Sequence, residues 1–269
     1  MTARRPCRHN AGMDSQVIGN SGQALLDAVV RETGPAPAWA IVWLHGLGAD
    51  GHDFEPIVPE LVRRDWPAIR FVFPHAPVRA VTINNGVRMR AWYDIRDMDL
   101  ANRADEAGVE ESVAQVEALI ARENARGIPN ERIVLAGFSQ GGAITLAAGL
   151  RRREPLAGLV ALSTYLPAPQ KAATHLQEPA RSQPLFFAHG TQDPVVPFQA
   201  GQYSAALLQK LGFAVDWHSY PMAHQVCAEE IRDLGDWLSR RLFTLAWRPP
   251  PANARSPGCR ICADCLGWR

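Results

Sequence analysis

A serine held between two glycines is the residue in this chain best placed to do chemistry. Residues 132–136 read as a short apolar strand, Gly137-Phe-Ser-Gln-Gly141 as a sharp turn, and residues 142–150 as a small apolar helix. In such an elbow a Cβ at either glycine would collide with the neighbouring strand or helix, and the turn lifts the Ser139 hydroxyl clear of the sheet as a nucleophile. A tightly packed turn that catalyses nothing fits the same pattern. Other residues of the chain must therefore distinguish the catalytic turn from the structural one.

Two further polar residues follow strands that we predict later in the chain. Asp193 lies in the proline-bracketed loop 190–197 after the apolar run 185–190, and His224 lies in the loop 221–224 after the strand 213–220. Taken alone, Asp193 would be an ordinary Asp-Pro turn. The chain order Ser139, Asp193, His224 is, however, that of the α/β-hydrolases. It predicts that His224 takes the serine proton, that Asp193 fixes the histidine tautomer, and that an acyl-enzyme forms.

Other histidines and a second acid compete for these roles. His45 and His189 also follow strands, but they precede Ser139 or Asp193 in the chain. The remaining competitors lie in proline-containing loops or inside the last strand: His75, His175, His218 and the acid Asp216. We expect all of them to be structural or solvated.

Two backbone N–H groups are predicted to bind the oxyanion. Gln140 opens the helix after the nucleophile, where N–H groups have no partner within the helix. Leu47 lies in the glycine-rich turn His45-Gly-Leu-Gly-Ala-Asp50, which leaves a central strand at the edge where α/β sheets bind ligands. A phosphate-binding loop is the alternative, but the turn lacks the Lys-Ser/Thr of a P-loop and the G-x-G-x-x-G spacing. No metal or organic cofactor is needed for this reaction.

The elements that position these residues alternate between strand and helix. Strands are predicted at 23–31, 39–45, 69–73, 132–136, 156–162, 185–190 and 213–220, and helices at 54–64, 105–126, 142–150, 198–211 and 226–243. Asn85-Gly86 indicates a hairpin. The irregular segment from Trp92 to Ala104 is a candidate flap, where Met98 and Leu100 would line an acyl pocket or pack locally. The fold class is α/β: a single domain with a mostly parallel central sheet and helices on both faces.

Composition excludes several classes of function. The chain has 269 residues and a net charge of +1, which offers no general field for nucleic acid or an anionic membrane. It has no apolar run long enough for integral membrane association and no secretory signal, so we expect a cytoplasmic protein. Residues 1–20 are predicted to be a disordered leader, with Met13 as an alternative start to Met1. Residues 21–245 are predicted to form the catalytic domain. In the tail, 246–269, Cys259-Arg-Ile-Cys-Ala-Asp-Cys265 has the spacing of a metal site but no fourth ligand, so a disordered extension is favoured.

Several ordered motifs together resemble one family. His45-Gly-Leu-Gly-Ala-Asp50, Gly-Phe-Ser-Gln-Gly-Gly142, Ser163-Thr-Tyr-Leu-Pro167, Gly190-Thr-Gln-Asp-Pro-Val-Val-Pro197 and Met222-Ala-His224 are similar to those of the phospholipase/carboxylesterase family, over about residues 20 to 243. The resemblance implies a serine hydrolase of small-molecule acyl esters or thioesters. It also implies a shallow acyl groove walled by Trp92, Leu166 and Val195, and it allows a homodimer.

Three functions are compared on this basis. The favoured one is a serine carboxylesterase that acts on short to medium acyl esters. An acyl-protein thioesterase or lysophospholipase would use the same triad and differ in the groove, which the sequence does not distinguish. A binding protein of the same fold without turnover is disfavoured, because Ser139, Asp193 and His224 are all present.

Overall fold

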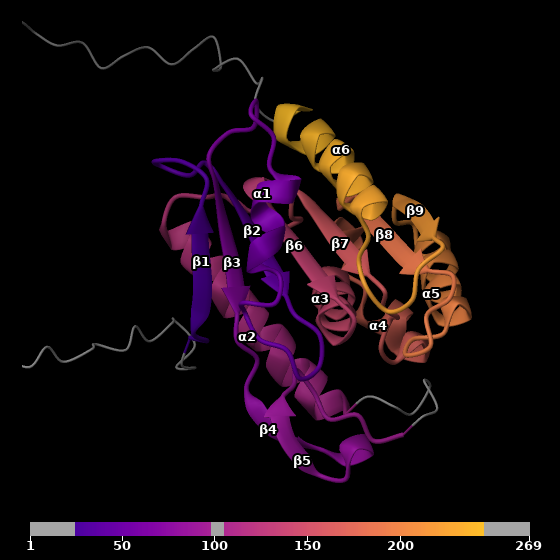
Figure 1. Cartoon of the computed structure of the whole chain (residues 1–269). Coiled ribbons are helices and arrows are strands. Elements are labelled where there is room, and N and C mark those ends of the chain that lie inside the picture. The colour runs from indigo at the N-terminus through magenta and orange to yellow at the C-terminus, as the bar shows by residue number, and fades with distance from the viewer. Residues whose placement is uncertain (1–24, 98–104, 245–269) are drawn as a thin grey trace, which may run out of the picture.

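The structure is a computed structural model, and it describes residues 25–97 and 105–244 (Figure 1). The predicted leader, the predicted tail with its cysteines, and Met98 and Leu100 of the candidate flap lie outside these residues. Within the described ranges, no helix is both long and apolar enough to cross a bilayer.

One sheet carries the strands that lead to the predicted site. Its members are β1 (Ala28–Glu32), β2 (Trp39–Leu44), β3 (Ile69–Pro74), β6 (Ile133–Phe138), β7 (Gly158–Leu162), β8 (Leu185–Gly190) and β9 (Val215–Tyr220). They form a seven-stranded sheet in the order β1-β3-β2-β6-β7-β8-β9. Neighbouring strands are parallel except β1, which is antiparallel to β3 at the edge. The mostly parallel sheet that the sequence predicts is confirmed.

Helices cover both faces of this sheet (Figure 1). They are α1 (Val58–Leu61), α2 (Glu106–Ala125), α3 (Gln140–Leu150), α4 (Ala172–His175), α5 (Phe198–Lys210) and α6 (Ala228–Thr244), with short 3-10 turns η1 (Glu55–Ile57), η2 (Thr82–Asn84), η3 (Asn130–Arg132), η4 (Pro169–Lys171) and η5 (Glu178–Ser182). Side chains of β2 alternate between two cores. Ala40 and Val42 belong to the core on the side of α2, α3 and α5, whereas Trp39 and Ile41 belong to the core on the side of α1 and α6. Every residue of β2 is therefore buried, as expected for a central strand covered on both faces.

The predicted helix 54–64 is too long. The chain forms only η1 and α1 there, and Val62 is already extended. Trp66 is buried instead of continuing the helix, and its indole N–H donates to Ser239 Oγ of α6 at 2.9 Å. The residue before Pro67 is also disfavoured in helical backbone, so the chain turns toward β3 early.

A separate hairpin lies beside the glycine-rich loop of residues 45–50. Strands β4 (Val78–Val81) and β5 (Val87–Arg90) pair antiparallel, which confirms the predicted hairpin. Asn85 and Gly86 both have positive φ, 54° and 75°, the conformation that these residues adopt readily in turns. The N–H of Gly48 donates to the carbonyl of Arg90 at 2.9 Å, so the base of the hairpin is joined to the glycine-rich loop.

Candidate active site

Ser139 stands at the turn between β6 and α3 in a strained backbone conformation. Its φ and ψ are 54° and −119°, which L-residues rarely adopt. A Cβ on Gly137 would collide with the backbone of Gly141, and a Cβ on Gly141 would collide with the carbonyl of Leu44. Both glycines are thus required for the close approach of β6, α3 and β2. The predicted elbow is present at the predicted residues.

Ser139, His224 and Asp193 form a continuous chain of hydrogen bonds. The Ser139 hydroxyl lies 2.9 Å from His224 Nε2, and His224 Nδ1 lies 2.7 Å from Asp193 Oδ2. When Nδ1 carries the proton and donates a hydrogen bond to the carboxylate, Nε2 carries a lone pair and accepts the hydrogen bond from the serine hydroxyl. The loops after β6, β8 and β9 therefore bring together the three residues that the sequence analysis selected.

Asp193 is held ionised and fixed in position. Burial alone would raise its pKa, but hydrogen bonds from His189 and His224 and from the N–H groups of Val196 and Val195 hold the pKa well below its usual range. The two N–H groups reach Oδ1 at 2.8 and 2.9 Å, leaving Oδ2 for the histidine. The carboxylate is thus a fixed negative charge that can stabilise an imidazolium.

The glycine-rich loop lies directly against the nucleophile. A Cβ on Gly46 would come within 3.5 Å of Ser139 Cβ. Among the described residues, neither the N–H of Leu47 nor that of Gln140 donates to a backbone acceptor outside helices and strands. The two predicted oxyanion donors therefore come from the loop after β2, which lies against Ser139, and from the residue that follows Ser139 at the start of α3.

Comparisons with known proteins identify relatives of this chain. A family model described as Phospholipase/Carboxylesterase matches residues 26–242. The chain belongs to the phospholipase/carboxylesterase family. Acyl-protein thioesterase 1 of Cryptococcus neoformans is 40% identical over 219 residues, covering 75% of this chain and 92% of that protein. Carboxylesterase SOBER1 of Arabidopsis thaliana is 36% identical over 205 residues, covering 75% of this chain and 90% of its own length.

A crystal structure of Arabidopsis thaliana SOBER1 also resembles the fold. It has a TM-score of 0.72 at 35% identity and covers 76% of this chain and 99% of that one. The predicted family, the α/β-hydrolase fold and the class of enzyme, a hydrolase, are confirmed by these similarities.

The sequence analysis missed the supporting hydrogen bonds of two side chains, Gln140 and Thr164, and it left the partner of His45 unspecified. The side chain of Gln140 bridges the hairpin exit: its Oε1 accepts from the N–H of Trp92 and its Nε2 donates to the carbonyl of Tyr93, both at 2.8 Å. Thr164 Oγ1 donates to the carbonyl of Ser139 at 2.6 Å. His45 Nε2 accepts from the N–H of Ala76 at 3.0 Å. For Gln140, the signal in the sequence is a polar residue at the start of a buried helix. The prediction used only its backbone N–H and not its side chain.

His45 serves the glycine-rich loop as a neutral side chain. Burial lowers its pKa to about 4, so the imidazole stays uncharged at neutral pH. Its backbone carbonyl accepts from the indole N–H of Trp92 at 2.9 Å. The prediction of a structural role for this histidine agrees with that placement.

The predicted groove walls are only partly where the resemblance implied. Trp92 is 0% exposed and Leu166 is 2% exposed, whereas Val195 is 49% exposed. Trp92 lies under the loop that its indole binds, and the N–H of Leu166 donates to Ser204 Oγ in the core. Because a wall of an open groove needs accessible surface, Trp92 and Leu166 do not form one in this structure. Val195 alone has the exposure that the prediction requires.

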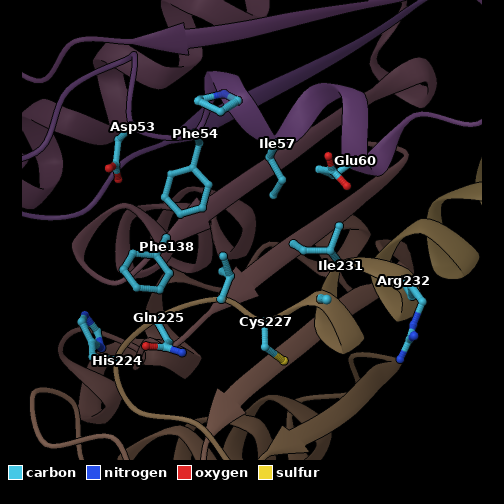
Figure 2. A pocket seen from close by; sticks show the side chains of 13 residues that line it. Asp53, Phe54, Ile57, Glu60, Phe138, His224, Gln225, Cys227, Ile231 and Arg232 are labelled. Atoms are coloured by element: carbon cyan, nitrogen blue, oxygen red, sulfur yellow. The ribbon is translucent and has the colours of Figure 1, made fainter.

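A pocket of about 750 Å³ adjoins the hydrogen-bonded chain of Ser139, His224 and Asp193 at His224 (Figure 2). It lies between the segment containing η1 and α1 and the segment that runs from His224 into α6. Phe138, the residue before the nucleophile, also lines it, with its ring 4.8 Å from the His224 ring centroid. Sequence reasoning missed this pocket, because its two sides are far apart in the chain.

One group among the described residues has the donor set of a metal site. Asp50, His52 and His75 bring their ligand atoms within 4.8 Å of one another. The Asp50 carboxylate already accepts from the N–H of His52 at 2.8 Å, and His75 Nδ1 accepts from the N–H of Gly51 at 3.1 Å. None of the three belongs to the hydrogen-bonded chain at Ser139.

Proposed function

We propose that the enzyme is a serine carboxylesterase that hydrolyses short to medium acyl esters through Ser139, His224 and Asp193. The observation that carries the proposal is the unbroken chain from Ser139 Oγ through both nitrogens of His224 to an ionised Asp193. Such a chain activates a hydroxyl that is otherwise a weak nucleophile.

The reaction follows from the geometry in two halves. Ser139 Oγ attacks the acyl carbonyl while its proton moves to His224 Nε2, and the ionised Asp193 stabilises the imidazolium. The N–H groups of Leu47 and Gln140 bind the developing oxyanion. His224 then gives its proton to the leaving oxygen or sulfur, and an acyl-enzyme remains. Water activated by the same histidine hydrolyses the acyl-enzyme and regenerates the serine.

The acyl side of the site is assigned to the neighbourhood of Val195. This exposed side chain follows Asp193 closely and its N–H binds the Asp193 carboxylate, so it is fixed beside the triad. A short wall of this kind favours acyl chains of modest length. The homodimer and the cytoplasmic location stay predictions.

A second candidate function is favoured by the relatives. Acyl-protein thioesterase 1 of Cryptococcus neoformans is 40% identical to this chain, more than the 36% of SOBER1. An acyl-protein thioesterase or lysophospholipase would use the same triad on long acyl chains. We place it second because Val195 is the one exposed residue among the three predicted groove walls, Trp92, Leu166 and Val195.

The test is the dependence of kcat/KM on acyl length for p-nitrophenyl esters and for acyl thioesters, from two to sixteen carbons, with Ser139→Ala as the blank. We expect a maximum at short esters. A maximum at long thioesters would replace the first function by the second. Saturable ligand binding without turnover would overturn both in favour of a binding protein.

A further inference from the structure

The pocket beside His224 has room for much more than the reacting atoms. Its volume of about 750 Å³ lies within the range of small-molecule sites. Figure 2 shows His224 and Phe138 at one end and Ile231 and Arg232 at the other. The pocket therefore extends away from the triad along the space between α1 and α6.

The lining is apolar in the middle and charged at the rim. Its apolar side chains are Phe54, Pro56, Ile57, Phe138, Val226 and Ile231, and its charged ones are Asp53, Glu60 and Arg232. The charged residues are exposed, whereas Phe54 and Ile57 are buried. A fitting ligand has an apolar body and an end that stays in water.

The position of His224 indicates which half of the substrate would lie here. In acyl transfer, the histidine must lie next to the leaving atom to which it returns the proton. His224 lines this pocket, whereas the proposed oxyanion donors Leu47 and Gln140 and the proposed acyl wall Val195 do not. The pocket thus continues from the side of the triad at which the leaving group departs.

We propose that this pocket binds the leaving group, an alcohol or thiol whose apolar body has several carbons. The inference rests on the proposed function and adds its substrate class: esters and thioesters with a bulky apolar leaving group. The same site would also bind an acceptor, because the second half of the reaction is the first half reversed with a different nucleophile.

A further activity follows, the transfer of the acyl group to a bound alcohol. The alcohol oxygen forms a bond to the acyl carbon of the acyl-enzyme while its proton moves to His224 Nε2. The bond between that carbon and Ser139 Oγ then breaks, and the histidine proton returns to Oγ. The products are a new ester and free enzyme, so atoms and charge balance without another reactant.

The experiment measures partition of one acyl-enzyme between water and added alcohols. p-Nitrophenyl butyrate is the donor, p-nitrophenol release reports acylation, and chromatography separates butyrate from the alkyl butyrates. With methanol, 1-butanol and 1-hexanol at equal concentration, we expect the ratio of ester to acid to rise by about threefold per added methylene. We also expect it to saturate with hexanol.

Matched substitutions locate the effect. Ala228 lines the pocket in the first turn of α6, and Ala107 is another exposed alanine in the first turn of a helix, α2, beside a different cavity. We expect Ala228→Trp to lower the hexanol-to-methanol preference by tenfold or more. Ala107→Trp should leave it unchanged.

Reversible chemical filling gives an independent version of the test. Cys227 lines the pocket and is a free, partly exposed thiol. Benzyl methanethiosulfonate should remove the hexanol preference, and dithiothreitol should restore it. In Cys227→Ala, which keeps every other cysteine, the reagent should not change the preference.

Three results would overturn the proposal: equal transfer to methanol and hexanol, a hexanol preference that survives both ways of filling the pocket, or a shift in acyl-length preference on filling. The last would make this the acyl site. Failure of the proposed function itself would look different, because p-nitrophenol release would then not depend on Ser139.

Discussion

The turn that carries Ser139 and the pocket that adjoins His224 differ in what gives them their shape. The turn is shaped by backbone: Gly137 and Gly141 touch backbone atoms of neighbouring elements, and no larger residue fits. The pocket is shaped by side chains of η1, α1 and α6, many of them exposed. Substitutions in the turn should therefore abolish the reaction or the fold, whereas substitutions in the pocket should change which substrate is used.

The largest expected difference is between a substitution in the proposed catalytic residues and one in the proposed substrate wall. Asp193→Asn should lower kcat/KM by about 10⁴-fold, because the amide no longer holds His224 in the required tautomer. Val195→Ala, two residues away, should change kcat/KM by less than about tenfold, the cost of a small apolar contact. Steady-state kinetics on p-nitrophenyl butyrate measures both. Equal losses of kcat/KM in the two variants would contradict the different roles assigned to Asp193, in the reaction, and Val195, in substrate selection.

The lowered pKa of Asp193 also gives this substitution a pH signature. The ionised carboxylate stabilises the fold above the pKa of about 4 that an unfolded aspartate has, and this contribution is lost as pH falls through the lower native pKa. The stability advantage of wild type over Asp193→Asn should thus be full at pH 7 and shrink below about pH 4. Urea unfolding at several pH values measures it. An advantage that grows toward acid would contradict the assigned sign.

A smaller difference is expected in the free energy of unfolding between a substitution in the backbone of the turn and one in the pocket wall. Gly141→Ala should destabilise the fold by roughly 3 kcal/mol or more, because the new Cβ collides with the carbonyls of Leu44 and His45. Ile231→Val in the pocket wall should cost about 1 kcal/mol. Urea unfolding midpoints at neutral pH provide the comparison. If Gly141→Ala is as stable as wild type, the turn is looser than described.

A group in α6, the helix on one side of the pocket, should give fold stability the opposite pH dependence. Burial raises the pKa of Glu230, in the first turn of α6, to about 8, and the N–H of Cys227 lowers it only in part. Stability from this group is therefore full below the unfolded pKa of about 4 and is lost as pH rises through about 8. Glu230→Gln should match wild type at or below about pH 4 and melt at a higher temperature at pH 9. A lower melting temperature at pH 9 would contradict the buried, protonated state.

The smallest effect concerns the strain at Ser139. Its φ of 54° and ψ of −119° suit glycine, so Ser139→Gly should be about 1 kcal/mol more stable than Ser139→Ala. Both variants lack the hydroxyl, which leaves backbone freedom as the difference between them. Thermal unfolding of the two side by side is the measurement, and an equal Tm would argue against strain in the turn.

The sequence was sufficient for residues that stand at the ends of strands. Ser139, Asp193 and His224 each follow an apolar run, and parallel strands bring such ends to one edge, so their proximity could be predicted from chain order alone. The groove walls and the side chains that support the site could not be predicted in this way, because their positions depend on how the loops fold back onto the sheet. Trp92 looked like a groove wall, but it is buried under the carbonyl of His45. The side chain of Gln140 supports the hairpin exit through contacts 47 and 48 residues away in the chain.

The pocket was beyond sequence reasoning for the same reason. Phe54 and Ile57 come from the region where a long helix was wrongly predicted, and Val226 and Ile231 come from the other end of the chain. No periodicity relates these two segments, so their meeting is a tertiary event.

Covalent labelling shows whether Ser139 is the nucleophile. The protein is treated with a fluorophosphonate, ester hydrolysis is followed in parallel, and the labelled peptide is identified by mass spectrometry. We expect one phosphonyl group per chain, on Ser139, with hydrolysis lost in proportion to labelling, and no label in Ser139→Ala. Loss of hydrolysis with the label on another residue, or continued hydrolysis by the folded Ser139→Ala variant, would contradict it.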